Sequence, residues 1–207
     1  AAEGTFRFQA GAFPGSPVMN ACMCAFATYD IPNQHTVGYD VVCNRPKAAA
    51  YRAPGSPISA FGVESVLDIL AKKIRMDPLE FRLKNAADVG TSMVYGPKLG
   101  HGGYKETIKA LLDHPGYNAG LGPNQGRGVA SGYWFNGGGE SGATVHLNAD
   151  GTAVVATGSP DIGGSRASMA IMAAETFGID YDQVRATVAD TTAVGYTHVT
   201  GGSRVTY

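Results

Sequence analysis

The chain has 207 residues, enough for one domain or two small ones. With a net charge of −1 and 16% charged residues, it lacks the basic excess that a nucleic-acid surface or a polybasic membrane patch requires. Its 29 glycines, beside so few charges, are typical of a loop-rich interior in which backbone segments approach closely.

The cysteines give a first indication of the compartment. Cys22, Cys24 and Cys43 are odd in number and have neither a disulfide framework nor the spacing of a CxxC motif. We therefore expect buried free thiols. No apolar run approaches the roughly 18 residues of a membrane helix, and no signal-peptide pattern opens the chain. These features predict a reducing, cytoplasmic setting without a membrane.

The first half of the chain alternates strand and helix patterns. Period-two alternation predicts strands, and apolar residues at helical spacing predict helices. Asp77 as N-cap, Pro78 at the first helical position and Glu80 at the third mark a helix start. In chain order, we expect a strand at 4–10, a short helix at 18–28, a strand at 36–44, and helices at 58–75, from Asp77 to Asn85 and at 105–112.

The pattern changes after the stretch at 114–127, which is rich in Gly, Pro and Asn and is the best linker in the chain. Asn148-Ala-Asp-Gly151 is a hairpin signal between two alternating runs. The second half predicts strands at 128–135, 142–147 and 152–157, a helix at 168–177, and a turn and strand at 181–189. The predicted fold class is therefore α+β, with mixed sheets and packed helices, in two segments at 1–118 and 119–207.

One short sequence, Gly-Gly-Ser-Arg, occurs twice, at 163–166 and at 201–204. Glycines let a backbone approach a ligand closely, and a serine can cap a helix start. An arginine offers a forked contact to phosphate or carboxylate. The two copies predict two walls of one anion-binding cleft. The alternative is two glycine-rich turns, with serines as caps and arginines on a solvated face.

Two motifs carry a family resemblance. Residues 50–57, Ala-Tyr-Arg-Ala-Pro-Gly-Ser-Pro, and 76–85, Met-Asp-Pro-Leu-Glu-Phe-Arg-Leu-Lys-Asn, resemble the large subunit of molybdenum hydroxylases, the xanthine dehydrogenase/aldehyde oxidase family. The resemblance covers essentially the whole chain and is weakest at 91–125. Within the family, residues 159–163 and the repeated Gly-Gly-Ser-Arg are similar to bacterial nicotinate dehydrogenase-like chains.

The resemblance implies parts of two adjacent molybdopterin-binding domains in an oxidoreductase. Such enzymes hydroxylate a carbon of an N-heteroaromatic or aldehyde, with water as the oxygen source. The implied cofactor is molybdopterin with molybdenum, and its cytosine dinucleotide form is left open. Implied partners are iron–sulfur and FAD-containing subunits or domains, the remainder of the large subunit and a small-molecule substrate.

The resemblance also assigns residues near the metal and substrate. Arg52 matches an arginine whose loop abuts the metal ligands, and a surface arginine in a turn is the alternative. Asn20 matches a substrate-pocket position that holds an arginine in purine-oxidising members. Pro54 matches a pocket position that often holds an aromatic residue stacked on the substrate. Losing that arginine argues against a xanthine-type substrate, whose developing negative charge it would stabilise. Tyr133 and Trp134 also match pocket positions, with core aromatics as the alternative.

Cofactor contacts are assigned to both repeated loops, and no side chain is expected to ligate the metal. Gly163 stands where many relatives have a glutamine, so a backbone contact would replace a side-chain one. Arg166 and Arg204 have no firm counterpart, and we expect them near the pyrophosphate or dinucleotide end. The full set of predicted cofactor-binding residues in the loops is Gly163, Gly164, Ser165, Gly201, Gly202 and Ser203, beside Arg52.

Two family features are missing from the sequence. One is a Gly-Gly-Gly-Phe-Gly-Gly-type loop, and the other is the glutamate that acts as general base, which we expect beyond Tyr207. Neither Glu140 nor Glu175 is assigned that role, so the segment is not expected to catalyse a reaction alone. Two hypotheses stay open: a segment of a hydroxylase, and a non-catalytic glycine-rich module for anion binding or assembly that retains the fold.

Overall fold

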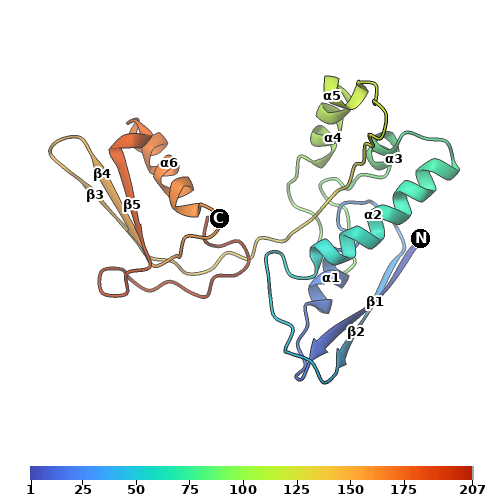
Figure 1. Ribbon diagram of the computed structural model, residues 1–207, viewed down its shortest axis with the longest axis horizontal. Coiled ribbons are helices and arrows are strands. Elements are labelled where there is room, and N and C mark those ends of the chain that lie inside the picture. Colours follow the sequence, from blue (N-terminus) through green and yellow to red (C-terminus); the bar gives the residue numbers. More distant parts are fainter. Residues whose placement is uncertain (207) are drawn as a thin grey trace. The chain divides into compact units, whose positions relative to one another are not determined.

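The computed structural model describes residues 1–206 and divides into two compact units, which meet between Trp134 and Phe135 (Figure 1). This boundary lies later in the chain than the predicted change between residues 118 and 119. The assignment of 1–118 and 119–207 to two molybdopterin-binding domains stays a prediction. The mixture of helices and sheets in both units agrees with the predicted α+β class.

The first unit begins with a strand–helix–strand arrangement. Strands β1 (Ala2–Gly11) and β2 (Gln34–Val42) pair in parallel, and α1 (Val18–Cys24) forms the crossover that parallel strands require. Both predicted strands are confirmed, whereas the helix is shorter than the predicted range of 18–28. Phe8 of β1 is buried against Val18 and Ala21 of α1, so the helix packs on the pair of strands.

Four helices complete the first unit: α2 (Ser56–Lys73), α3 (Pro78–Lys84), α4 (Tyr104–Leu112) and α5 (Pro115–Asn118). The predicted N-cap is confirmed, because the Asp77 carboxylate accepts from the backbone N–H groups of Leu79 and Glu80, the second and third residues of α3, at 2.8 and 3.0 Å. Within the described residues, no helix combines the length and apolarity needed to cross a membrane. Leu79, Ala86 and Ile108 form the buried core between α3 and α4.

A buried polar network joins these helices. Glu64 of α2 is 5% exposed, and its carboxylate accepts from the Tyr29 hydroxyl at 2.5 Å and from Arg82 Nε at 2.8 Å. Arg82 of α3 is fully buried and also lies 2.8 Å from Asp68 of α2. Burial, with the neighbouring carboxylate, raises the pKa of Tyr29, so it remains a donor. The network fixes α2 against α3 and against the turn after α1.

The second unit is a three-stranded sheet with one packed helix. Strand β3 (Ala143–Leu147) pairs antiparallel with β4 (Ala153–Thr157), and β4 pairs in parallel with β5 (Val184–Val188). Helix α6 (Ser165–Phe177) and a 3-10 helix (Tyr181–Gln183) form the crossover between the parallel strands. The predicted hairpin is confirmed. The buried core of this unit consists of Ala153, Val155, Ala170, Ala174 and Val184.

The strand predicted at 128–135 is wrong, since the structure has no strand there. Side chains of α2 satisfy part of its backbone instead: Glu64 Oε2 accepts from the Ser131 N–H at 2.9 Å, and Ser56 Oγ donates to the Tyr133 carbonyl at 2.6 Å. Alternation reports on which side chains face inward, but it says nothing about whether a neighbouring strand is available. The segment is therefore held by side chains in place of a β-ladder.

Removing the buried cation should destabilise the first unit strongly. In Arg82→Met, Glu64 stays buried without its cationic partner, which we expect to lower the free energy of unfolding by about 3–5 kcal/mol. The matched control is Lys84→Met on the same helix, where the side chain is exposed and a change below about 0.5 kcal/mol is expected. Urea unfolding followed by circular dichroism measures both, and equal effects would contradict the role of the ion pair.

Candidate functional site

The loop before α2 is locked against the start of α1 by one glycine. Gly55 has φ = +90°, and a Cβ at this position would lie 2.3 Å from the Pro17 carbonyl oxygen and 2.8 Å from the Ala21 nitrogen. No larger residue fits without displacing the backbone of α1. The contact holds the loop that carries Arg52 against the helix that carries Asn20.

Several predicted site residues therefore lie on segments that touch each other. Arg52 is exposed at the tip of the loop, and Pro54 and Asn20 are half-buried. Ser56, at the first position of α2, donates to the carbonyl of Tyr133 at 2.6 Å. The first unit thus brings the three segments that contain Asn20, Arg52–Pro54 and Tyr133 into direct contact.

The hydroxyl of Tyr133 is engaged inside the first unit. It donates to the sulfur of Met93 at 3.6 Å and lies 3.4 Å from the hydroxyl of Tyr95. Burial, and then the Tyr95 hydroxyl, raise the pKa of Tyr133, so it stays protonated at neutral pH. Tyr133 is therefore suited to form a wall of a pocket rather than to act as a base. Trp134, which follows it, is half-buried.

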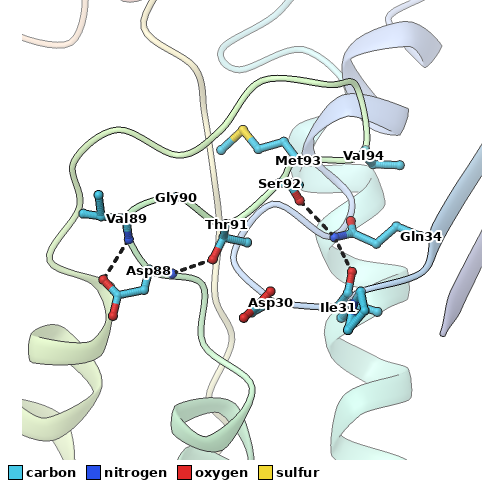
Figure 2. Close-up of a pocket in the computed structure, with 11 residues that line it drawn as sticks. Asp30, Ile31, Gln34, Asp88, Val89, Gly90, Thr91, Ser92, Met93 and Val94 are labelled. Carbon is cyan, nitrogen blue, oxygen red and sulfur yellow. Dashed lines mark hydrogen bonds between the residues drawn. The ribbon is translucent and has the colours of Figure 1, made fainter.

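A cavity of about 560 Å³ lies beside this tyrosine, between the loops at 30–34 and 88–94 (Figure 2). The Gln34 amide joins the two loops by donating to one carbonyl of each, at 2.9 and 3.3 Å. None of the site residues predicted from the sequence lines this cavity, although Met93, the hydrogen-bond partner of Tyr133, does. This cavity thus adjoins a hydrogen-bond partner of Tyr133 without containing any predicted site residue.

In the second unit, both Gly-Gly-Ser-Arg loops come after strands that end at the same side of the sheet. Thr157 ends β4 and Val188 ends β5, and these two residues are partners in the parallel ladder. The loops that follow the two strands therefore leave the sheet at one edge. The copy at 163–166 leads directly into α6, whereas the copy at 201–204 is reached after a longer loop.

In the first Gly-Gly-Ser-Arg copy, the space beside the backbone of Gly164 is open. Gly163 and Gly164 have φ values of 60° and 85°, and a Cβ on Gly164 would meet nothing within 4 Å. Gly164 is the N-cap, so Ser165 lies one residue inside the helix and does not fill the cap position. The Ser165 hydroxyl instead binds two backbone groups of the preceding loop, at 3.0 and 3.2 Å.

A carboxylate already faces the start of α6. Asp161 accepts from the Arg166 backbone N–H at 3.2 Å, and its other oxygen lies 3.2 Å from the Arg166 guanidinium. An acidic group at a helix N-terminus is electrostatically favourable. Asp161 thereby neutralises both the helix terminus and Arg166, so the first loop presents little net positive charge. The sequence contained the signal, an aspartate shortly before the glycines, but its role was missed.

The second copy has the opposite electrostatics. Arg204 is 4% exposed and donates to the carbonyls of His198 at 2.7 Å and Glu140 at 2.5 Å, and to the Ser141 hydroxyl. All of these partners are neutral, and within residues 1–206 no carboxylate forms an ion pair with Arg204. A buried cation without a counter-charge favours a nearby anion.

The glycines of the second copy have two different surroundings. A Cβ on Gly202 would lie 3.1 Å from the backbone of Gly137, whose N–H donates to the Gly202 carbonyl at 2.8 Å. Gly202 is thus required by packing within the unit. A Cβ on Gly201 would meet nothing within 4 Å, and Ser203 is exposed. Gly201 and Ser203 are therefore the members of this loop that are free to face a ligand.

Comparisons with known proteins show which family the two units resemble. Two family models, both described as molybdopterin cofactor-binding domain, match residues 1–86 and 114–207. An aldehyde oxidoreductase of Megalodesulfovibrio gigas is 32% identical over 194 residues, which is 86% of this chain and 21% of that protein. A putative xanthine dehydrogenase molybdenum-binding subunit of Escherichia coli is 34% identical over 157 residues, 69% of this chain and 21% of that protein.

The fold has solved counterparts. The aldehyde oxidoreductase from Desulfovibrio gigas matches with a TM-score of 0.71 and 27% sequence identity, covering 97% of this chain and 24% of that one. The chain therefore spans about a quarter of the length of the relatives it matches. Within residues 1–206, no group of three or more His, Cys, Asp or Glu side chains is placed to hold a metal ion.

Two glycine-to-alanine substitutions, one just before α2 and one within it, test the contact between Gly55 and α1. Gly55→Ala should lower the free energy of unfolding by more than about 1 kcal/mol, because the new Cβ collides with the backbone of α1 and φ is positive. Gly62→Ala should raise it by about 0.5–1 kcal/mol, because its Cβ meets nothing and alanine favours a helix interior. Denaturant unfolding measures both, and a stable Gly55→Ala variant would contradict the packing.

Proposed function

Because the chain belongs to the molybdenum hydroxylase family, we propose that it supplies molybdopterin-binding parts of an oxidoreductase. The proposed reaction is hydroxylation of an aldehyde or N-heteroaromatic carbon, with water as the oxygen source. The observation that carries the proposal is the second Gly-Gly-Ser-Arg loop. There a buried arginine, Arg204, lies below exposed backbone without a partner carboxylate in the described chain.

The residues present fit an anionic pterin cofactor. The phosphate of such a cofactor needs positive charge and close backbone approach, which Arg204, Gly201 and Ser203 provide in the second loop. Gly163 and Gly164 of the first loop offer backbone with little charge, so we assign them to an uncharged part of the cofactor. When bound, the cofactor would supply the redox chemistry that transfers oxygen from water to the substrate carbon.

The residues of the first unit would contact the substrate and the metal-bearing end of the cofactor. Arg52 carries its charge on a loop that Gly55 and Pro54 keep rigid, which suits an anionic metal centre. Asn20 offers an uncharged amide where purine-oxidising members have an arginine. That exchange favours neutral substrates such as aldehydes, because position 20 no longer carries the cation that would stabilise a developing negative charge on the substrate. Tyr133 would form a wall of the pocket.

The proposal includes protein partners. Iron–sulfur and flavin subunits or domains would accept the electrons, and the remainder of the large subunit would contribute further cofactor contacts, with the cytosine dinucleotide form as one option. Ile58, Phe61 and Ile69 on α2 are more than half exposed, which supports a covering protein surface. All three cysteines are free thiols, although only Cys24 is buried as expected, and free thiols support a reducing, cytoplasmic setting.

A second candidate function is a non-catalytic module for anion binding or assembly. The observation that favours it is the first loop, where Asp161 already occupies the anion position at the start of α6 and neutralises Arg166. Gly163 has also replaced the glutamine of many relatives. This candidate predicts an intact fold that retains no molybdenum.

The two repeated arginines give a matched test in the complete enzyme that contains this chain. Arg204→Met should lower retained molybdenum and pterin about tenfold, because the buried positive charge that favours an anion is lost together with the hydrogen bonds that hold the loop to the His198 and Glu140 carbonyls. Arg166→Met should retain both, because Asp161 already neutralises that arginine. Metal analysis by mass spectrometry and pterin fluorescence after oxidation measure the two contents.

The controls separate loss of the cofactor from loss of the fold. Arg204→Lys keeps the charge and should retain more cofactor than Arg204→Met at matched thermal stability. Equal cofactor content in Arg204→Met and Arg166→Met would contradict the assignment of the second loop. An intact wild-type preparation without molybdenum would remove the enzyme proposal and leave the non-catalytic module.

A further inference from the structure

The segment that carries Tyr133 has an unusual support. It has no regular secondary structure, and two side chains of α2 hold its backbone at alternate residues. Glu64 Oε2 accepts from the Ser131 N–H at 2.9 Å, and Ser56 Oγ donates to the Tyr133 carbonyl at 2.6 Å. The position of Tyr133 therefore depends on side chains of one helix and not on a ladder of backbone hydrogen bonds.

Both supports are themselves fixed. The Glu64 carboxylate is held by the Tyr29 hydroxyl and by Arg82 Nε, and all three residues are buried. The Ser131 hydroxyl is in addition hydrogen-bonded to the hydroxyl of Tyr104 on α4. The Ser131 end of the segment is thus anchored from two helices, and neither anchor is free to swing into solvent.

Ser56 links the segment to the arginine loop. It is 6% exposed and directly follows Gly55, whose backbone is locked against α1. A single hydroxyl therefore joins the loop that carries Arg52 and Pro54 to the backbone of Tyr133. Neither Ser56 nor Glu64 belongs to the residues assigned to the substrate or the cofactor.

We propose that Ser56 and Glu64 are positioning residues that set the spacing between the Arg52–Pro54 loop and Tyr133, and with it the width of the substrate pocket. The inference rests on the proposed function, in which these residues line that pocket. Loss of the Ser56 hydroxyl lets the Tyr133 backbone move away from the loop. The change weakens substrate binding, and it leaves the reacting centre of the enzyme intact.

The test uses the complete molybdenum-containing enzyme with acetaldehyde and benzaldehyde as probes. Ser56→Ala should raise KM for the smaller acetaldehyde about three- to tenfold, the range expected for one lost hydrogen bond, because this probe no longer spans the widened pocket, and KM for benzaldehyde should rise less. The kcat and the molybdenum content should stay within about twofold of wild type. The matched control is Ser65→Ala on the same helix. Ser65 is exposed, and its hydroxyl donates to the Phe61 carbonyl within α2, so its KM should not change.

A double-mutant cycle separates positioning from a general loss of stability. If Ser56 acts through Tyr133, the variant Ser56→Ala/Tyr133→Ala should have the KM of Tyr133→Ala alone, whereas independent effects would multiply. Glu64→Gln should raise KM as well, with a lower melting temperature because its partner Arg82 loses the opposing charge.

The outcomes distinguish this inference from the proposed function. A wild-type KM in Ser56→Ala, with a raised KM in Tyr133→Ala, overturns the positioning role and keeps the pocket. A wild-type KM in Tyr133→Ala for both probes overturns the pocket assignment and the inference with it. A parallel fall of kcat and molybdenum content in Ser56→Ala, without a change in KM, shows that Ser56 only stabilises the fold.

Discussion

The first unit depends on one buried carboxylate. Glu64 accepts from Tyr29, Arg82 and Ser131, which come from three segments far apart in the sequence. A buried charge is costly unless it is paired and hydrogen-bonded, and here each contact meets that need from a different part of the chain. The same carboxylate therefore fixes α2 against α3, against the turn after α1 and against the segment that carries Tyr133. The arrangement of the predicted pocket residues follows from it.

The second unit shows how identical short sequences acquire opposite electrostatics. In the first Gly-Gly-Ser-Arg loop, Asp161 lies within reach of Arg166 and neutralises it. In the second, the guanidinium of Arg204 is folded inward, where Gly139 leaves room: a Cβ at that glycine would lie 3.0 Å from Arg204 Nε. The repeat gives both loops the same hydrogen-bond donors. The neighbouring residues decide whether the arginine of each loop is paired with a carboxylate.

Local patterns predicted the elements well, because periodicity and caps are properties of neighbouring residues. The Asp77 cap, the existence of strands β1 and β2, and the hairpin between β3 and β4 are of this kind. The strand at 128–135 failed because its backbone partners, Ser56 and Glu64, lie 67 or more residues away along the chain. The family resemblance supplied the candidate site positions, and these stay predictions. The charge distribution of the site was not predictable, since the roles of Asp161 and Arg204 depend on tertiary contacts.

A glycine-rich sequence does not by itself locate a ligand, because glycines meet two different demands. At Gly55 and Gly202, the space of a Cβ is taken by the backbone of the same unit, so packing alone explains the residue. At Gly164 and Gly201 that space is open. Only the second class leaves backbone accessible to a cofactor. Among the glycines assigned to the cofactor, Gly201 therefore rests on the ligand hypothesis, whereas the positive φ of Gly164 and the packing of Gly202 favour glycine even in a chain that binds nothing.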